Sequence, residues 1–314
     1  MGWGNPYFLL DILDKELPYL AYAPSFKGMI YGPYEGTPEL IEETRKVIKH
    51  VLDQSYKHIL ITNGASNAIN LLLRHFAEGG GRTVYTTEYG YPSYEEMIKR
   101  AGLDRVRDLD KYPFNLGTSQ LSMRLIDSPE NPHGHQHSIG SADTDIWDAV
   151  YHSKIYTKDL ETKPNHKYLV GSYSKLLGIA GFRIGFIATN DTLAYESLVK
   201  QLHNETTGVS RPSQEYLTKI LKTIDLELFM LKGRRDLWNN KTEFQKIEYL
   251  FDRQKVNENG MFYCVKADPK AVDILDKAGI VYVRLDQDTI RLSMGQTITT
   301  TQEAIKAILK EDGK

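Results

Sequence analysis

The chain contains a single cysteine, Cys264, and no long uninterrupted hydrophobic run among its 314 residues. One cysteine cannot close an internal disulfide and gives no cysteine cluster for zinc, which favours a reducing compartment. No apolar stretch approaches the roughly 20 residues that a membrane-spanning helix needs, so we expect no membrane association. The first residues lack the basic and apolar regions of a secretory signal, and we therefore expect a cytoplasmic protein.

An excess of charge of one sign is also missing. Lys and Arg total 39 against 41 Asp and Glu, a net charge of -2, so there is no basic field for nucleic acid and we exclude it as a partner. Hydrophobic residues make up 41% of the chain and charged residues 25%, which is typical of globular proteins and not of disordered ones. At roughly 150 residues per domain, the length predicts about two domains.

Short apolar runs alternate with amphipathic segments over the first two thirds of the chain. Thr37-Pro38-Glu39 is typical of a helix start, and further helices are expected after residue 64 and over residues 94–101. Strands are expected over residues 58–62, 83–87, 122–127, 145–148, 168–172 and 184–189. Strands separated by helices predict an α/β fold with a doubly wound, mostly parallel sheet.

The pattern changes after Asp191, where it is helical as far as about Tyr249. The tail then alternates strands at 261–265, 281–285 and 290–293 with helices at 271–278 and 301–309, which predicts a smaller α+β domain. The first 36 residues show little periodicity and contain four prolines, so they are interpreted as an arm. The expected organisation is residues 1–36 as an arm and part of the small domain, 37–240 as the large domain and 241–314 as the C-terminal small domain.

Residues 168–189, YLVGSYSKLLGIAGFRIGFIAT, carry the strongest chemical signal. Lys175 follows a strand, Ser172 and Ser174 precede it, and Arg183 lies eight positions further on. A lysine amine forms a Schiff base with a carbonyl, hydroxyls donate hydrogen bonds, and a guanidinium binds a phosphate through two bonds. Ser-x-Ser-Lys alone is equally typical of a solvated surface lysine, whereas the complete string is far more specific.

The complete string resembles the lysine signature of the fold-type I pyridoxal phosphate enzymes, the aspartate aminotransferase superfamily. The resemblance implies pyridoxal 5'-phosphate as the cofactor, held by the large domain. It implies Lys175 as the Schiff-base lysine and Arg183 as a phosphate ligand, with Ser172 and Ser174 also in contact with the cofactor.

Two segments upstream of the lysine match the same superfamily in the expected order. The strand-to-helix turn that contains Gly64, Ala65 and Ser66 corresponds to its phosphate-binding loop, where backbone N–H groups and a helix N-terminus bind an anion. Tyr91, immediately before Pro92, stands where the family stacks an aromatic ring on the cofactor. Taken singly, the first is an ordinary turn and the second a packed tyrosine.

Two further segments supply polar groups for the cofactor ring. Residues 127–134, DSPENPHG, resemble the Ser-Pro-x-Asn-Pro-x-Gly turn, which implies that the side chain of Asn131 donates to the phenolic oxygen of the cofactor. The string from Asp148 to Tyr151 matches Asp-x-x-Tyr at a strand end. In the family the carboxylate pairs with the pyridine nitrogen and the tyrosine reaches the phenolic oxygen.

The resemblance also implies how substrate and subunits are held. Arg291, in the string IRLS, corresponds to the arginine that binds the substrate α-carboxylate as a planar fork. Tyr31 stands where the family uses a tyrosine that reaches the phosphate of the neighbouring subunit, so a homodimer with shared active sites is expected.

A narrower likeness, to the alliinase and plant tryptophan aminotransferase group, is carried by residues 4–8 (GNPYF), 180–185 (AGFRIG) and 205–214 (ETTGVSRPSQ). These strings are partly shared with histidinol-phosphate aminotransferases. Within the first string, Asn5 is expected to contact the substrate.

The function implied is transfer of an amino group from an α-amino acid, or an amine of similar shape, to a 2-oxo acid, with Lys175 as general base and acid. The alternative is a lyase that uses the same site for β-elimination of a sulfur leaving group or for decarboxylation. A non-enzymatic binding module is a third possibility, against which the intact lysine argues.

The segment between Asn131 and Asp148 departs from the family pattern. Only 16 residues lie between them, which leaves no room for a helix that family members usually have. His133, His135 and His137 alternate there and share one side of an extended segment. We expect no metal site, because we find no acidic or cysteine partner at a typical spacing, and we expect Cys264 to be a buried small hydrophobe.

Overall fold

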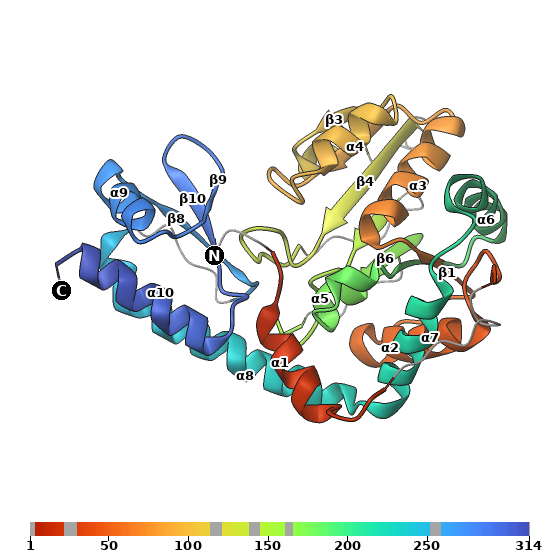
Figure 1. Ribbon diagram of the computed structural model, residues 1–314. Coiled ribbons are helices and arrows are strands. Elements are labelled where there is room, and N and C mark those ends of the chain that lie inside the picture. The colour runs from red at the N-terminus through yellow and green to blue at the C-terminus, as the bar shows by residue number, and fades with distance from the viewer. Residues whose placement is uncertain are drawn as a thin grey trace.

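The structure, a computed structural model, describes residues 4–21, 30–113, 121–137, 145–160, 166–251 and 259–313. Its main element is a seven-stranded sheet with the order β1-β7-β6-β5-β4-β2-β3 (Figure 1). The strands are β1 (His58–Thr62), β2 (Thr83–Thr86), β3 (Asp104–Val106), β4 (Ser122–Asp127), β5 (Ile146–Asp148), β6 (Tyr168–Ser172) and β7 (Gly185–Thr189). Strand β7 runs antiparallel to both neighbours and the other pairs are parallel, which confirms the expected mostly parallel sheet.

Helices cover both faces of this sheet, because neighbouring residues of each strand point to opposite sides. On β6, Tyr168 and Val170 enter one core, which contains α3 (Ala65–Glu78), α4 (Tyr94–Arg100) and α6 (Thr192–Thr206). Leu169 enters the other core, which contains α2 (Pro38–Leu52) and α7 (Arg211–Thr223). The doubly wound arrangement is therefore confirmed.

A second, three-stranded antiparallel sheet has the order β8-β10-β9. It consists of β8 (Phe262–Lys266), β9 (Val283–Arg284) and β10 (Thr289–Ser293), flanked by α9 (Pro269–Lys277) and α10 (Ile298–Glu311). The long helix α8 (Leu226–Phe244) and a 3-10 turn, η5 (Gln245–Leu250), lead into it. Figure 1 shows α8 running along the base of the molecule from the large sheet to the small one.

The N-terminal segment contains a helix that the sequence interpretation missed, α1 (Tyr7–Glu16). Its buried residues Phe8, Leu9, Ile12 and Leu13 do recur at helical spacing, and Pro6 and Pro18 flank the helix without interrupting it. Helix α1 packs on α8. Pro24, one of the four prolines that suggested an extended arm, lies outside the described residues.

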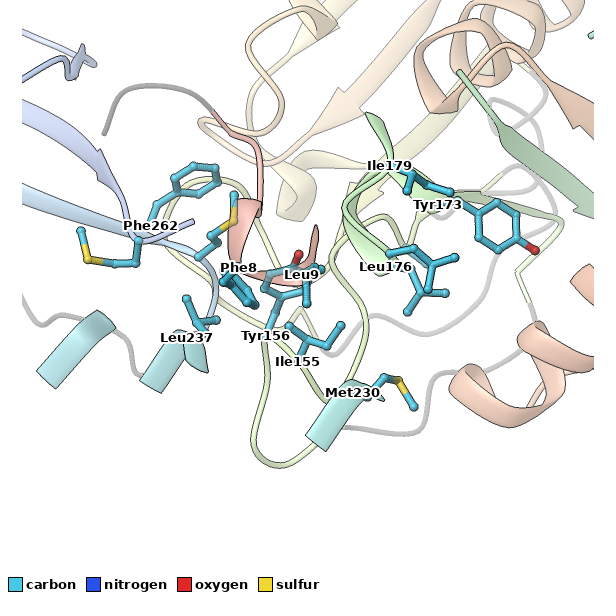
Figure 2. Close-up of a cluster of buried hydrophobic side chains, with 14 of the residues drawn as sticks. Phe8, Leu9, Ile155, Tyr156, Tyr173, Leu176, Ile179, Met230, Leu237 and Phe262 are labelled. Carbon is cyan, nitrogen blue, oxygen red and sulfur yellow. The ribbon is translucent and has the colours of Figure 1, made fainter. Parts of the chain in front are cut away.

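Helix α1 belongs to a hydrophobic cluster that connects the two sheets (Figure 2). The cluster joins residues of α1, of α8, of the short helix α5 (Tyr173–Leu176) and of β8, namely Phe8, Leu9, Met230, Leu237, Tyr173, Leu176 and Phe262. Because α5 follows β6 directly, this packing fixes the backbone immediately around Lys175.

The remaining differences from expectation are small. Strand β3 was not predicted, because only one of its three residues, Val106, is apolar. Between Asn131 and Asp148 the described residues contain a turn and β5 but no helix, while residues 138–144 lie outside the described part. Among the described residues, no helix is long and apolar enough to span a bilayer.

Candidate active site

A cavity of about 370 Å³ lies where the carboxyl ends of the parallel strands, the N-terminal segment and the small sheet meet. Ligands of open α/β sheets bind at this edge. Twelve of the residues predicted for the site line the cavity: Asn5, Ala65, Ser66, Tyr91, Asn131, Asp148, Tyr151, Ser172, Ser174, Lys175, Arg183 and Arg291. Gly64 lies against the guanidinium of Arg183. Tyr31 lies on the surface, with 82% of its area exposed.

Lys175 occupies the single-turn helix α5, which begins where β6 ends. The hydroxyl oxygen of Ser172 caps this turn by accepting a 3.1 Å hydrogen bond from the N–H of Ser174. The Lys175 ammonium donates to the carbonyl of Gly4. Burial, and then the charges of Arg291 and Arg183, lower the pKa of Lys175 to about 8. A fraction of this amine is therefore neutral, and thus nucleophilic or basic, near neutral pH.

An anion cradle forms one end of the cavity. Helix α3 begins after Gly64, which has φ +80° and no side chain to cap the first-turn N–H groups. A Cβ at Gly64 would lie 2.8 Å from Nη2 of Arg183, and a Cβ at Gly185 would lie 2.6 Å from the carbonyl carbon of Gly64. The two glycines therefore let the guanidinium and strand β7 come close to the helix N-terminus. Ser66 and Ser174 also line this cavity.

Asp148, at the end of β5, is buried and accepts two hydrogen bonds. Tyr94 Oη donates to its Oδ2 at 2.6 Å, and the N–H of Val150 donates to its Oδ1 at 3.1 Å. Burial raises the pKa of the Asp148 carboxyl, and the bonds from Tyr94 and Val150 oppose that rise. A cationic ring nitrogen placed against Asp148 would give the carboxylate an ionic partner in addition to its two hydrogen bonds. Tyr94, three residues after Tyr91, was not predicted as a site residue.

Arg291 extends from β10 of the small sheet into the same cavity. Its Nη1 donates to Oδ1 of Asn131 at 3.2 Å, so the two predicted residues are in direct contact. Its guanidinium also lies 4.3 Å from the ring centre of Phe262, and burial lowers the pKa of Arg291. Phe262 was not predicted as a site residue, because an aromatic residue in a strand is typical of any core.

Another unpredicted carboxyl, Asp127, lines the cavity at the end of β4. It accepts a 2.9 Å bond from the hydroxyl of Thr87 and a 3.0 Å bond from the N–H of Asn131. Asn5, predicted as a substrate contact, has its side-chain amide bonded to the phenolic oxygen of Tyr7 at 3.2 Å.

The three alternating histidines lie around the carboxylate of Glu130, which was not predicted as their partner. Oε2 of Glu130 lies 4.0 Å from Nδ1 of His133, 3.4 Å from Nδ1 of His135 and 3.7 Å from Nε2 of His137. Among the residues that the structure describes, no group of three or more His, Cys, Asp or Glu is arranged to hold a metal ion. Cys264, expected to be buried, is partly exposed.

The donor set fits pyridoxal phosphate. The cradle around Gly64 and Arg183 suits a phosphate dianion, and the buried carboxylate of Asp148 suits a protonated ring nitrogen. Lys175 provides an amine with a lowered pKa, and Asn131 and Arg291 provide an amide and a guanidinium on the facing wall.

Comparison with known proteins gives a consistent picture. A family profile described as Allinase matches residues 82–264, and one described as Aminotransferase class I and II matches residues 24–134. An alliin lyase of Allium cepa var. aggregatum is 27% identical over 190 residues, which cover 55% of this chain and 42% of the lyase. The chain thus spans less than half the length of that relative.

Two other known proteins are matched over a larger share of their own length. A 3-methylarginine biosynthesis aminotransferase of Streptomyces arginensis is 26% identical over 244 residues, 68% of this chain and 65% of its own length. The structure of an aromatic aminotransferase from Pyrococcus horikoshii OT3 superimposes with a TM-score of 0.74 at 18% identity, over 99% of this chain and 94% of that one. The last similarity establishes the fold.

Proposed function

This chain belongs to the alliinase family within the fold-type I pyridoxal phosphate superfamily, and we propose that it is an aminotransferase that moves an amino group from an α-amino acid to a 2-oxo acid. Membership of the superfamily implies pyridoxal phosphate as the cofactor. When bound, this group supplies an aldehyde that condenses with primary amines and a ring that withdraws electrons from the substrate Cα.

The observation that carries the proposal is the convergence of Lys175, Asp148 and Arg291 on one cavity from three separate elements. Lys175 provides an amine, Asp148 a buried carboxylate and Arg291 a buried guanidinium. Transamination needs a proton carrier, a partner for the ring nitrogen and a binding group for carboxylates, and these three residues supply them.

Lys175 carries out the proton transfers in this proposal. It would hold the cofactor at rest, and its freed amine would remove a proton from the substrate Cα. With a pKa of about 8, the freed amine is basic enough to accept that proton and acidic enough to return it. The adjacent backbone is held by Tyr156, whose hydroxyl donates a 2.7 Å bond to the carbonyl of Lys175.

The other cavity residues bind and orient in this proposal. Asp148, held by Tyr94, keeps the ring nitrogen protonated. Arg183 and the N-terminus of α3 bind the phosphate. Arg291 binds the carboxylate that amino donor and oxo-acid acceptor share, which explains how one pocket can accept both substrates in turn.

A lyase is the second candidate, and the alliinase family match over residues 82–264 and the similarity to alliin lyases favour it. Elimination would use the same proton removal by Lys175 but expel a leaving group from the substrate Cβ. Two matches favour transamination. The aminotransferase class I and II profile covers residues 24–134, and the Streptomyces relative is similar over more of both chains.

Product analysis separates the two reactions. The purified holoenzyme is incubated with single amino acids, with and without a 2-oxo acid. An aminotransferase forms no more than about one oxo acid per site without the acceptor, turns over continuously only when the acceptor is present, and releases no ammonia. Release of ammonia with pyruvate, or of carbon dioxide, independently of an acceptor would establish the lyase.

We further propose a homodimer in which Tyr31 reaches the phosphate site of the neighbouring subunit. Tyr31 is 82% exposed in the single chain, and Tyr19 and Ile30 nearby in sequence are 94% and 65% exposed. These exposed side chains are available for contact with a second subunit.

A further inference from the structure

Asp127 has no part in the mechanism above, although it lines the cavity beside Asp148. The two aspartates are register partners at the carboxyl ends of the neighbouring parallel strands β4 and β5. Only 4% of Asp127 is exposed. A buried carboxyl at the wall of a binding cavity is costly unless it performs a function or is well bonded.

The hydrogen bonds of Asp127 form part of a chain that joins the two sheets. Its Oδ1 accepts from the Thr87 hydroxyl at 2.9 Å, just beyond β2, and its Oδ2 accepts from the N–H of Asn131 at 3.0 Å. The side chain of Asn131 continues the chain, because its Oδ1 accepts from Nη1 of Arg291 at 3.2 Å. Asp127 thus supports Asn131 from the large sheet, and Asn131 contacts Arg291 on the small sheet.

We propose that Asp127 is a positioning residue for substrate binding: its carboxylate fixes the peptide of Asn131 and, through the Asn131 side chain, the guanidinium of Arg291. Protonation of Asp127 weakens this support and lowers the affinity for the substrate carboxylate. The inference rests on the proposed function, in which Arg291 binds that carboxylate.

The surroundings of Asp127 make its charge sensitive to pH near neutrality. The titratable groups that face it come from each neighbouring element: Asp148 of β5, Glu130 of the following turn, Tyr94 of α4 and Tyr151 beyond β5. Burial, with smaller contributions from the two carboxylates, raises the pKa of Asp127 to about 7, and the bonds from Asn131 and Thr87 oppose the rise.

The donors around Asp127 determine which of its two hydrogen bonds is weakened when the carboxylate is protonated. The hydroxyl of Thr87 can rotate and accept a hydrogen bond, whereas the N–H of Asn131 can only donate. The proton therefore resides on Oδ1 of Asp127, and Asn131 retains a neutral acceptor in place of a charged one. Charge-assisted bonds are roughly twice as strong as neutral ones, so we expect a loss of about threefold to tenfold in carboxylate affinity below pH 7.

The test is Asp127→Asn in the holoenzyme, because an amide keeps an acceptor toward Asn131 but cannot ionise. The ligand is the 2-methyl analogue of the best amino donor, which has no α-proton and therefore cannot be transaminated. Wild-type affinity should fall about threefold to tenfold between about pH 8.5 and about pH 6. Asp127→Asn should bind with the weaker affinity at both pH values, with KM for the donor raised and kcat and cofactor affinity within about twofold of wild type.

Two further measurements keep the proposal falsifiable. Thr87→Val removes a bond that favours the charged form, so it should move the midpoint of the affinity change to higher pH. An infrared carboxylic-acid band that titrates near pH 7 should be present in wild type and absent from Asp127→Asn, whether or not cofactor is bound.

The outcomes distinguish the inference from the function on which it rests. The inference alone is wrong if wild type binds the analogue and Asp127→Asn shows the same pH dependence, or if the variant loses kcat and cofactor together. If wild type binds no amino donor or analogue at any pH, the proposed function fails and the inference fails with it.

Discussion

The phenolic oxygen of Tyr94 lies 2.6 Å from Oδ2 of Asp148, and both side chains are buried, with Asp148 at the wall of the cavity. This bond links the helix that follows Tyr91, α4, to the carboxylate proposed to pair with the cofactor ring. Burial, together with the negative charge of Asp148, raises the pKa of the Tyr94 hydroxyl well above its ordinary value, so Tyr94 donates throughout the working pH range. Asp148 therefore has a permanent donor on its second oxygen.

Tyr94→Phe should weaken the pairing of the Asp148 carboxylate with the ring nitrogen of the cofactor. The hydroxyl lowers the pKa of Asp148, so its loss raises that pKa and neutralises the carboxyl at higher pH than in wild type. We expect kcat to fall by about tenfold, corresponding to one buried hydrogen bond to a charged group, and the acid limb of the kcat profile to move to higher pH. Tyr94→Phe with an unchanged acid limb would contradict this account.

Lys175→Ala should abolish stable, coloured binding of pyridoxal phosphate and lower turnover by at least about 10³-fold. Borohydride treatment of the wild-type holoenzyme should fix the cofactor to the peptide that contains Lys175, as mass spectrometry would show. Lys167, which is half-buried immediately before β6 and paired with Asp191, offers a control lysine, since Lys167→Ala should leave colour and labelling intact. Labelling at another lysine, or none, would refute the assignment.

The rate at which the cofactor-free protein takes up pyridoxal phosphate should increase with pH through about 8. Only the neutral amine attacks an aldehyde, and Lys175, with its pKa lowered from 10.5, becomes neutral as pH passes that value. Arg291 contributes to the lowering, so Arg291→Gln should move the midpoint to higher pH, whereas Arg291→Lys keeps the charge and should not. Equal midpoints for the two variants would show that Arg291 does not influence the amine.

Tyr31 allows a test of shared active sites by subunit mixing. Tyr31→Ala and Lys175→Ala should each be impaired, the first mainly in cofactor affinity. In a mixed dimer of the two, one site carries both defects and the other carries neither, so mixing should restore activity to about a quarter of the wild-type level after random exchange. Absence of complementation between two well-folded variants, or a fully active monomer, would refute the shared site.

The sequence predicted best those elements whose signals are local. Strands β1 and β6 begin and end where expected, because each is a short, largely apolar run that stops at a turn or a capping serine. Helix α2 begins after Thr37, as the Thr-Pro-Glu string indicates. Helix α1 was not predicted, because the prolines on either side of it indicated an arm. The helical spacing of its apolar residues is the signal that could have revealed it.

The residues of the candidate site also fall into those that local motifs predicted and those that they did not. Residues within recognisable strings, such as Lys175, Asn131 and Arg291, were predicted from the sequence, and the structure places them on one cavity. Tyr94 and Thr87 were missed, because they act on Asp148 and Asp127 across separations of 54 and 40 residues that no single string reveals. Pairings of this kind depend on the register of neighbouring strands, which the apolar pattern alone does not specify.

A single half-reaction distinguishes transamination from elimination and decarboxylation. The holoenzyme is mixed with an amino donor in the absence of any oxo acid, and the cofactor spectrum is followed while ammonia and oxo acid are assayed. We expect conversion of the cofactor from its aldehyde to its amine form, about one oxo acid formed per site, no ammonia, and recovery of the aldehyde form on addition of a 2-oxo acid. Continuous release of ammonia with pyruvate, or of carbon dioxide, while the cofactor remains in its aldehyde form, would contradict it.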